Sequence, residues 1–570
     1  MRKLQYAAIS LASILSLTFL GSCSKDTEYI DRIITETDTL YIQKIDTVSP
    51  PTDTALCVGQ GVIEPTGGKV PLTIMVYSTG GRNLDYSTNM CFLTGLRYFA
   101  NDGSKSVVLG EDVNVVVQHK FSSAKNLYTS HQYNGKDYIT KETAKALGGN
   151  TYRSVFNTKG IEEYKSWIEK NSTTAIYNAI YKYSDLVGDS TYAINSAESL
   201  TDFIDYSTTV APAEKYILVI DDHGSGYHFD NNITRAVLQD DNRGGTTMSM
   251  PQIYNGIKDS DIKKVSAIIF NTCLENNLED LCELVGAADY AVAQSHLSIA
   301  SYNWIPFLSY YYKAQDGDDT DEGFESALDL FAKAAFSEVE QSTITSGIGK
   351  IVDSTNIVVD FYAHDICVTR LDKLEDVGAA ISDFSKFLID KQKEEDSLGV
   401  KTLADNVINK CYCYETGSNL YDVVDLVSLA YDNYPDEMEE IWNNFEDAVK
   451  NAIVACYNNS ETWDAKSSAL TNKGYNYDTS WSIYLNSKQK MFNPKENVSY
   501  TEDELDETYG TLKFREYTTD EDNTYSWYTW LLSNNVTPTG NPTAYPTRDA
   551  FLKFYSALAA NALQQRNSEE

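Results

Sequence analysis

The chain has 570 residues, of which 42% are hydrophobic and 12% aromatic. A chain of this length is too long to fold around a single hydrophobic core. We therefore expect a globular protein of two or three domains. The 82 acidic residues outnumber the 46 basic ones and give a net charge of −36, which excludes nucleic acid and an anionic membrane surface as electrostatic partners.

The first residues have the pattern of an export signal. Arg2 and Lys3 precede an apolar run, 7–20, that is shorter than a membrane-spanning helix. The run ends in Leu-Gly-Ser-Cys, which resembles a bacterial lipobox, so that Cys23 would carry the lipid. Cleavage as an ordinary secretory signal is the alternative. We expect residues 1–22 to be removed and the mature protein to be a lipoprotein of the cell envelope, at the outer membrane or cell surface.

Residues 23–67 are rich in Thr, Asp and Ile and contain a Pro-Pro pair, a composition typical of an extended stalk or linker. The chain has nine cysteines and six histidines, and their wide, irregular spacing indicates neither a disulfide framework nor a zinc site. No loop has the D-x-D-x-D-G spacing of an EF-hand. We therefore predict no metal and no other cofactor, although the acidic surface would permit calcium.

Residues 68–315 alternate short β-branched runs with stretches of helical periodicity, which predicts an α/β domain with a mostly parallel sheet flanked by helices. His119 alternates with apolar neighbours at a strand end and is interpreted as structural. The segment 126–165 is Tyr- and Thr-rich and is predicted to be a short β-hairpin excursion. Strands are expected at 70–77, 113–119, 216–220, 265–270 and 290–295, and helices at 89–100, 173–183, 197–207, 251–257 and 277–287.

Residues 316–570 have a different pattern, with long apolar faces that repeat at the helical period. This predicts a mainly helical C-terminal region, which has no internal repeat and no motif of evident chemical role. Helices are expected at 323–340, 371–393, 420–432, 435–457 and 547–565, with one strand at 357–361.

Two of the predicted strands each lead into a reactive side chain. The apolar run 216–220 is followed by Asp-Asp-His-Gly-Ser-Gly, and the run 265–270 by Asn-Thr-Cys-Leu. His223 and Cys273 therefore stand just past the carboxyl ends of two strands, the edge at which open α/β sheets bind ligands. We predict that the two side chains are neighbours, a cysteine nucleophile beside a histidine base.

A thiol becomes an effective nucleophile when a nearby imidazole or helix N-terminus favours its thiolate. Gly224 begins a Gly-Ser-Gly sequence whose small residues let an N–H turn inward, and with the amide of Cys273 it would form an oxyanion hole. Taken singly, Cys273 is more often a buried structural thiol and His223 a hydrogen-bonded strand-end histidine. Together, at two strand ends, they favour the catalytic interpretation.

These residues resemble the clostripain family of clan-CD cysteine peptidases, relatives of caspases with a caspase-like sheet. The resemblance rests on His-Gly-Ser-Gly after one strand, on Asn-Thr-Cys-Leu-Glu-Asn-Asn-Leu-Glu after another, and on the Ser-Thr-Gly-Gly-Arg-Asn-Leu turn after the first strand, and it extends over 68–310. It implies that His223 is the general base or acid and that Cys273 forms a thioester with the carbonyl of a protein or peptide substrate.

One position departs from the family pattern. The family usually has Asp two residues before the nucleophile, in the pocket that binds a substrate Arg or Lys, and this chain has Asn271 there. Asparagine cannot pair with a cation, and a buried guanidinium without a carboxylate is costly. We therefore expect a P1 preference that is not strictly basic. The expected pocket residues are Asn271, Ser295, Ser301 and Trp304.

Family members often cleave themselves after a basic residue in the loop between the His and Cys strands. The resemblance implies Arg235 and Ala236 as the cleavage site here, with Arg243–Gly244 as the second choice.

The first hypothesis is therefore a surface-tethered cysteine endopeptidase. The alternative is a catalytically weak or inactive relative that acts as a binding or adhesion lipoprotein. The unusual Asn271, the long Tyr- and Asn-rich C-terminal region and the stalk leave room for this alternative.

Overall fold

The computed structural model forms two compact units. The first comprises the described residues up to 224, then 237–273, 308 and 321–346, and the second comprises 274–296 and the described residues from 365 onward. The structure describes residues 69–81, 84–85, 110–133, 136–137, 139–156, 184–224, 237–296, 308, 321–346, 365–393, 411–412, 414, 420–458 and 481–484.

The first unit is built on six strands in the order β10-β7-β1-β2-β5-β6. The first four run parallel to one another, and β5 and β6 are antiparallel to their neighbours. The mostly parallel sheet that the sequence predicts is therefore confirmed. The strands are β1 (Val70–Thr79), β2 (Val113–Lys120), β5 (Thr151–Phe156), β6 (Asp185–Gly188), β7 (Ala213–Asp221) and β10 (Val265–Asn271).

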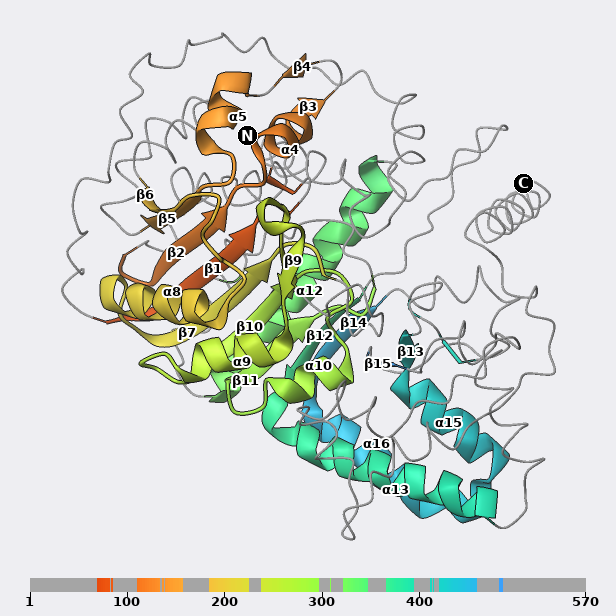
Figure 1. Cartoon of the computed structure of the whole chain (residues 1–570). Helices are drawn as coiled ribbons and strands as arrows, with labels where there is room; N and C mark the ends of the chain where they lie inside the picture. The colour runs from red at the N-terminus through yellow and green to blue at the C-terminus, as the bar shows by residue number, and fades with distance from the viewer. Residues whose placement is uncertain are drawn as a thin grey trace, which may run out of the picture. The chain divides into compact units, whose positions relative to one another are not determined.

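Helices cover this sheet because its central strands are apolar on both faces. Every residue of β2 and nearly every residue of β1 is buried, as expected for parallel strands in the middle of an α/β layer. Helices α8 (Ala197–Val210) and α9 (Met250–Lys258) lie side by side on one face of the sheet (Figure 1). Ser196 caps the first, and Ser249 with Gln252 forms a capping box on the second.

The segment 126–165 differs from the predicted hairpin. It contains two short helices, a small hairpin, and a strand that joins the main sheet through β2. The helices begin at the N-caps Ser123 and Thr140. They were not predicted because the Tyr/Thr composition of the segment is typical of strands. The further elements of the first unit are α4 (Ala124–Ser130), β3 (Gln132–Tyr133), β4 (Lys136–Asp137), α5 (Lys141–Leu147), β8 (Val237–Asp240), η3 (Asp241–Arg243), β9 (Thr246–Met248) and α12 (Asp321–Ser346).

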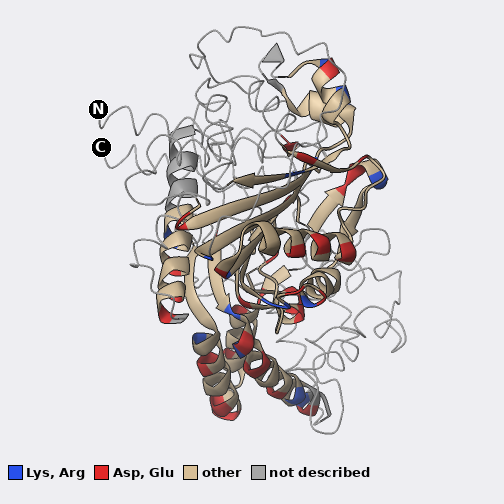
Figure 2. Cartoon of the chain, turned by 90° about the vertical axis from the view of Figure 1, so that its left-hand side faces the viewer, with Lys and Arg blue, Asp and Glu red and all other residues tan. Residues whose placement is uncertain are grey.

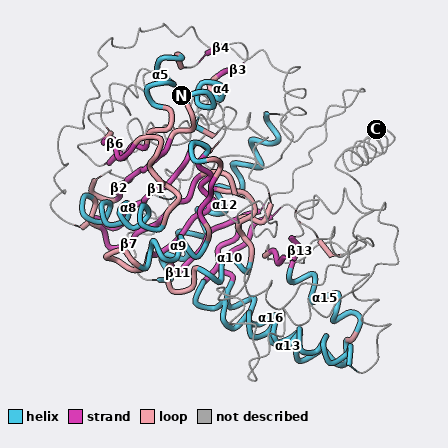
Figure 3. Tube along the Cα trace, in the orientation of Figure 1, coloured by secondary structure: helices cyan, strands magenta, loops and turns pink. Residues whose placement is uncertain are grey.

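The second unit combines an antiparallel set of strands, β14-β12-β11, with long helices. Helices α13 and α16 pack against each other (Figure 3), and Lys391 on the first pairs with Glu437 on the second. The elements are α10 (Leu278–Glu283), β11 (Ala288–Ala293), β12 (Asp365–Arg370), η4 (Leu371–Lys373), α13 (Leu374–Lys393), β13 (Leu420–Asp422), α15 (Val423–Asn433), α16 (Pro435–Ala452), β14 (Ile453–Asn458) and β15 (Ser482–Tyr484).

Three helix boundaries in this unit correct the sequence predictions. The helix expected at 435–457 ends at Ala452, and the β-branched run that follows is strand β14, paired with β12. The helix expected at 420–432 begins as the short strand β13, and the one at 277–287 spans only Leu278–Glu283. In each case the apolar spacing fits both periods over a few residues, and pairing with another strand or a cap decides between them.

Several predictions lie outside the described residues: the signal and stalk, the helices at 89–100, 173–183 and 547–565, and the strand at 357–361. Among the described helices, none combines the length and the hydropathy needed to cross a membrane. Acidic side chains are spread over helices of both units (Figure 2), in keeping with the net charge of −36.

Candidate active site

The carboxyl ends of three neighbouring strands are aligned in register. On β7, Asp221 lies opposite Ser78 of β1 on one side and opposite Asn271 of β10 on the other. His223 and Cys273 each follow two residues after a member of this rung. The two side chains therefore leave adjacent parallel strands at the same edge of the sheet and at the same distance along the chain from a paired rung.

The rung itself contains a buried polar pair. Asn271 donates from Nδ2 to Oδ1 of Asp221 at 3.1 Å, and both side chains are buried. Asn271 thus stands in the first unit, two residues before Cys273, bonded to a carboxylate of the strand that leads to His223. Sequence analysis placed Asn271 in a substrate pocket and did not anticipate this partner.

His223 is closely surrounded although it follows a strand end. Its side chain is 9% exposed, and a methyl group on Gly81 would come within 2.6 Å of its Cδ2. The next residue, Gly224, forms an isolated antiparallel bridge with Val237 at the start of β8. The histidine is therefore held between the turn that follows β1 and the hairpin that begins with β8.

Asp222 is a buried carboxyl group that sequence analysis missed. Its Oδ2 accepts a hydrogen bond from the backbone N–H of Gln239, and the carbonyl of Gln239 accepts one from Thr79 Oγ1 at 3.1 Å. Burial raises the pKa of Asp222 well above its ordinary value, and hydrogen bonds from Thr79 and from backbone amides only partly oppose this. The Asp-Asp pair before His223 was the available signal, since one of two adjacent acids at a strand end must point into the protein.

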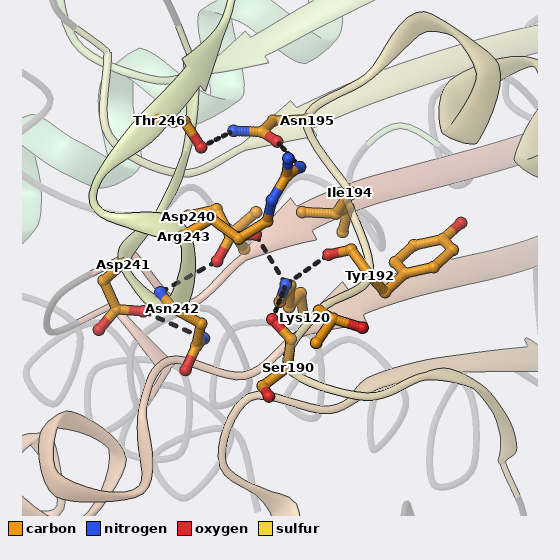
Figure 4. A network of polar contacts seen from close by, with 12 residues as sticks. Lys120, Ser190, Tyr192, Ile194, Asn195, Asp240, Asp241, Asn242, Arg243 and Thr246 are labelled. Carbon is orange, nitrogen blue, oxygen red and sulfur yellow. Dashed lines mark hydrogen bonds and ion pairs between the residues drawn. The ribbon is translucent and has the colours of Figure 1, made fainter.

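The hairpin formed by β8, η3 and β9, residues 237–248, is fastened to the sheet by a buried ion pair (Figure 4). Lys120 Nζ donates to Asp240 Oδ2 at 2.7 Å and to the carbonyl oxygens of Tyr192 at 2.5 Å and Ser190 at 3.4 Å. Both charged side chains are 1% exposed, and burial lowers the pKa of Lys120. All three protons of the ammonium therefore have acceptors, which is what a buried charge requires.

The same hairpin contacts the segment after β2. Asp241 accepts hydrogen bonds from the backbone N–H of Ser123 and from Asn126 Nδ2 at 2.5 Å, and Asn242 donates to the carbonyl of Phe121 at 3.2 Å. Within it, Leu238 has a left-handed φ of 60°. Non-glycine residues in that region are strained and cluster at functional sites, so this outlier is consistent with a site beside the hairpin.

Cys273 is buried, with 3% of its surface exposed, and in this structure its sulfur takes part in a disulfide. Cys282, Cys367, Cys411 and Cys456 are thiols that are not disulfide-bonded. The residue after Cys273, Leu274, has a φ of 65°, so the chain turns sharply as it leaves this cysteine.

Among the other predicted site residues, Ser295 is the one that the structure describes. Ser295 belongs to the second unit, where its N–H donates to Asp365 Oδ2 at 2.9 Å and its Oγ donates to the carbonyl of Asn276 at 2.9 Å. The others lie outside the described residues: Cys23, Arg235, Ala236, Ser301 and Trp304. The described part of the chain contains no group of three or more His, Cys, Asp or Glu side chains that could hold a metal ion.

Comparison with known proteins identifies the family. A model of the clostripain family matches residues 103–530. The chain belongs to the clostripain family. It is therefore a cysteine peptidase, a hydrolase whose substrate is a peptide or protein. The match continues through most of the C-terminal region, well beyond the resemblance over 68–310 that its motifs carry.

The chain is also similar to solved structures of this family. A secreted C11 cysteine protease from Bacteroides thetaiotaomicron, bound to an irreversible peptide inhibitor, is 13% identical, with 80% of this chain and 100% of that chain covered and a TM-score of 0.47. An inactive zymogen C11 protease from Parabacteroides distasonis is 15% identical, with 80% and 99% covered and a TM-score of 0.46. Comparison with curated proteins found no match.

Proposed function

We propose that this clostripain-family chain is an exported cysteine endopeptidase, tethered through a lipid on Cys23, in which His223 and Cys273 form the catalytic dyad. The observation that supports it most is the shared register of β7 and β10, which brings the two residues to one edge at equal distances past a paired rung. The close packing of Gly81 on His223 supports it further, since a general base needs a fixed orientation.

The proposed reaction begins when the thiolate of Cys273 attacks the scissile carbonyl carbon. The C–S bond forms, the carbonyl electrons move to oxygen, and the N–H groups of Gly224 and Cys273 stabilise this oxyanion. The intermediate collapses to a thioester as the C–N bond breaks, and the leaving amine takes its proton from His223. A water molecule, deprotonated by His223, then hydrolyses the thioester and regenerates the thiolate.

We also propose that the P1 preference is not strictly basic. Asn271 is uncharged and donates one amide proton to Asp221, which leaves its carbonyl oxygen as a hydrogen-bond acceptor and no formal charge of its own. An Asn271→Asp variant should raise the preference for P1 Lys or Arg over P1 Gln, measured on matched peptides. An unchanged ratio would contradict a role for Asn271 in this choice.

The decisive experiment uses the reduced full-length protein, because Cys273 is disulfide-bonded in this structure and only a thiolate can attack. Hydrolysis of a diverse peptide library should appear on adding a thiol reductant. It should disappear in Cys273→Ala and His223→Ala. Cys456→Ala, which removes a partly exposed thiol that is not disulfide-bonded, is the matched control and should keep the activity. Cleavage that survives in reduced Cys273→Ala would exclude the proposed dyad.

The alternative function is a binding or adhesion lipoprotein with little turnover. The disulfide at Cys273 favours it, since a blocked nucleophile cannot form a thioester. A folded, reduced protein that cleaves no library peptide would support this alternative.

Two associated proposals, the lipid anchor and self-cleavage, have separate tests. Cys23→Ala should move the protein out of the membrane fraction. Mass spectrometry of the purified chain should detect a cut between Arg235 and Ala236, which Cys273→Ala should prevent.

A further inference from the structure

The turn that follows β1 brings two glycines against functional groups. Gly80 donates its N–H to the carbonyl of Lys120 at 2.8 Å, and its own carbonyl accepts from the N–H of Leu84 at 2.7 Å. Gly81 has a left-handed φ of 49°. These bonds hold Gly80 against the end of β2 and against Leu84.

Gly81 touches the imidazole of His223 directly. A Cβ at this position would lie 2.6 Å from both His223 Cδ2 and Asp222 Oδ1, closer than van der Waals contact permits, and 3.2 Å from His223 Nε2. The edge of the ring that bears Nε2 therefore rests against the glycine backbone. Because no side chain lies between them, a displacement of this turn would change the position of the His223 imidazole.

Gly80 is packed in the same way against Asp85. A Cβ there would lie 1.9 Å from Oδ1 and 2.7 Å from Oδ2 of the carboxylate. The two neighbouring glycines thus contact Asp85 on one side, and His223 with Asp222 on the other. The position of the carboxylate consequently determines where the turn lies.

Asp85 is itself held by groups from the end of β2 and the residues after it. Its Oδ1 accepts from the N–H of Ser122 at 3.2 Å and lies 3.3 Å from His119 Nε2, and its Oδ2 accepts from Ser122 Oγ. On the other side of the ring, His119 Nδ1 is 2.7 Å from Ser78 Oγ on β1. All four side chains are at most 5% exposed, so each hydrogen bond is shielded from water.

The connection Ser78–His119–Asp85 has the chemistry of a Ser-His-Asp triad, but Ser78 is fully buried in a sheet strand and no substrate carbonyl could reach it. We propose instead that Asp85, held by His119 and Ser122, is a positioning residue for His223 and acts through Gly80 and Gly81. The proposal rests on the proposed role of His223 as general base and acid. It accounts for His119, which sequence analysis had interpreted as structural, as a member of the support for the catalytic histidine.

The test compares variants of the full-length, reduced protein on the best library peptide. Asp85→Asn keeps the shape of the side chain but replaces one of its two acceptor oxygens with an NH2 group. The hydrogen bonds to Ser122 and His119 should therefore weaken, so that the carboxamide and the turn are held less firmly. We expect kcat to fall about 10- to 100-fold with KM nearly unchanged, because a displaced base affects the chemical step and not substrate binding. We also expect the acidic limb of the pH profile of kcat/KM, which reports the free-enzyme base, to move.

His119 provides a rescue within the same network. His119→Gln retains an acceptor for Ser78 and a donor for Asp85 and should keep most of the activity, whereas His119→Leu retains neither and should resemble Asp85→Asn. Asp202→Asn is the matched control, since it removes a carboxylate bonded to Arg153 that is 65% exposed in the same unit. Its kcat and pH profile should stay at the wild-type values.

A result in which Asp85→Asn and His119→Leu lower only the melting temperature, with kcat and the pH profile unchanged, would overturn the proposal. If Asp85→Asn does not fold, the difference between His119→Gln and His119→Leu decides in the same way. Failure of the proposed dyad is recognised separately, since in that case reduced Cys273→Ala would still cleave the peptide.

Discussion

Two structures flank His223, and they are stabilised by different means. The turn after β1 contacts the imidazole itself through Gly81, and its support is a histidine–carboxylate network around Asp85. The 237–248 hairpin contacts the backbone of Gly224 and the carboxyl group of Asp222, and its support is the Lys120–Asp240 ion pair. The first arrangement can set the orientation of the His223 ring. The second holds the hairpin in place on the sheet.

This contrast predicts a separation of effects. Changes at the turn should reduce catalysis more than they reduce stability, because they displace a group that takes part in the reaction. Changes at the hairpin should reduce stability more than catalysis, because they leave a buried charge uncompensated at a distance from the reacting atoms.

The largest effect on stability is expected from Lys120→Met. The change leaves the Asp240 carboxylate buried without its cation, which should lower the free energy of unfolding by about 3–5 kcal/mol. The double variant with Asp240→Asn should recover much of this loss. Urea denaturation followed by tryptophan fluorescence measures both. Per folded molecule, kcat should change less than in Asp85→Asn, and a greater loss would remove the distinction between the two supports.

Gly81→Ala should have the largest effect on catalysis among the glycine changes. The new methyl would overlap the His223 ring, and the alanine would have to keep the left-handed φ of this position. We therefore expect kcat to fall about 100-fold and the free energy of unfolding to fall by about 1–3 kcal/mol. Gly244→Ala is the matched control. Gly244 has a φ of 76° and no atom within 4 Å of the added carbon, so only the backbone strain of about 1 kcal/mol is expected there, with normal kcat.

Asp222→Asn tests the hairpin contact through pH. Because the pKa of Asp222 is raised in the folded protein, the unfolded chain releases its proton first, and the wild type loses stability as pH rises above about 4. Asparagine does not titrate and can still accept from the N–H of Gln239. The melting temperature of the variant relative to wild type should therefore increase from pH 4 to pH 8. A difference that is constant with pH would show that Asp222 is ionised in both states.

The smallest effect is expected from Arg243→Ala. Arg243 Nη1 donates to Asn195 Oδ1 at 3.3 Å, a long hydrogen bond at the tip of the hairpin, while Asn195 keeps its bond to Thr246 at 2.9 Å. Stability should fall by no more than about 1 kcal/mol with unchanged kcat. A loss as large as that of Lys120→Met would mean that the tip, and not the ion pair, retains the hairpin.

The sequence was sufficient for the parts that depend on local pattern. The apolar β-branched runs at 216–220 and 265–270 predicted two of the central strands, and the polar residues after them placed His223 and Cys273 at strand ends. The family match bears out the resemblance drawn from these motifs. The roles of the two residues stay predictions, to be tested by the variants above.

The sequence was insufficient where partners are distant in the chain. Asp85 and His119 are 34 residues apart, and Lys120 and Asp240 are 120 apart, so no spacing rule connects them. Strand β14 was missed for a related reason. Its apolar residues continue the spacing of the preceding helix, and only pairing with β12 shows that the helix has ended.

Because β7 and β10 are paired in register, the alignment of His223 with Cys273 depends on the number of residues between the last paired rung and each side chain. Swaps among apolar strand residues of similar volume leave the count intact, so such residues can vary without misaligning the edge. Deleting one residue between Ile268 and Asn271 would instead retract the end of β10 by about 3.3 Å and turn its side chains to the opposite face. These strands should therefore tolerate many apolar substitutions during evolution but no insertion or deletion.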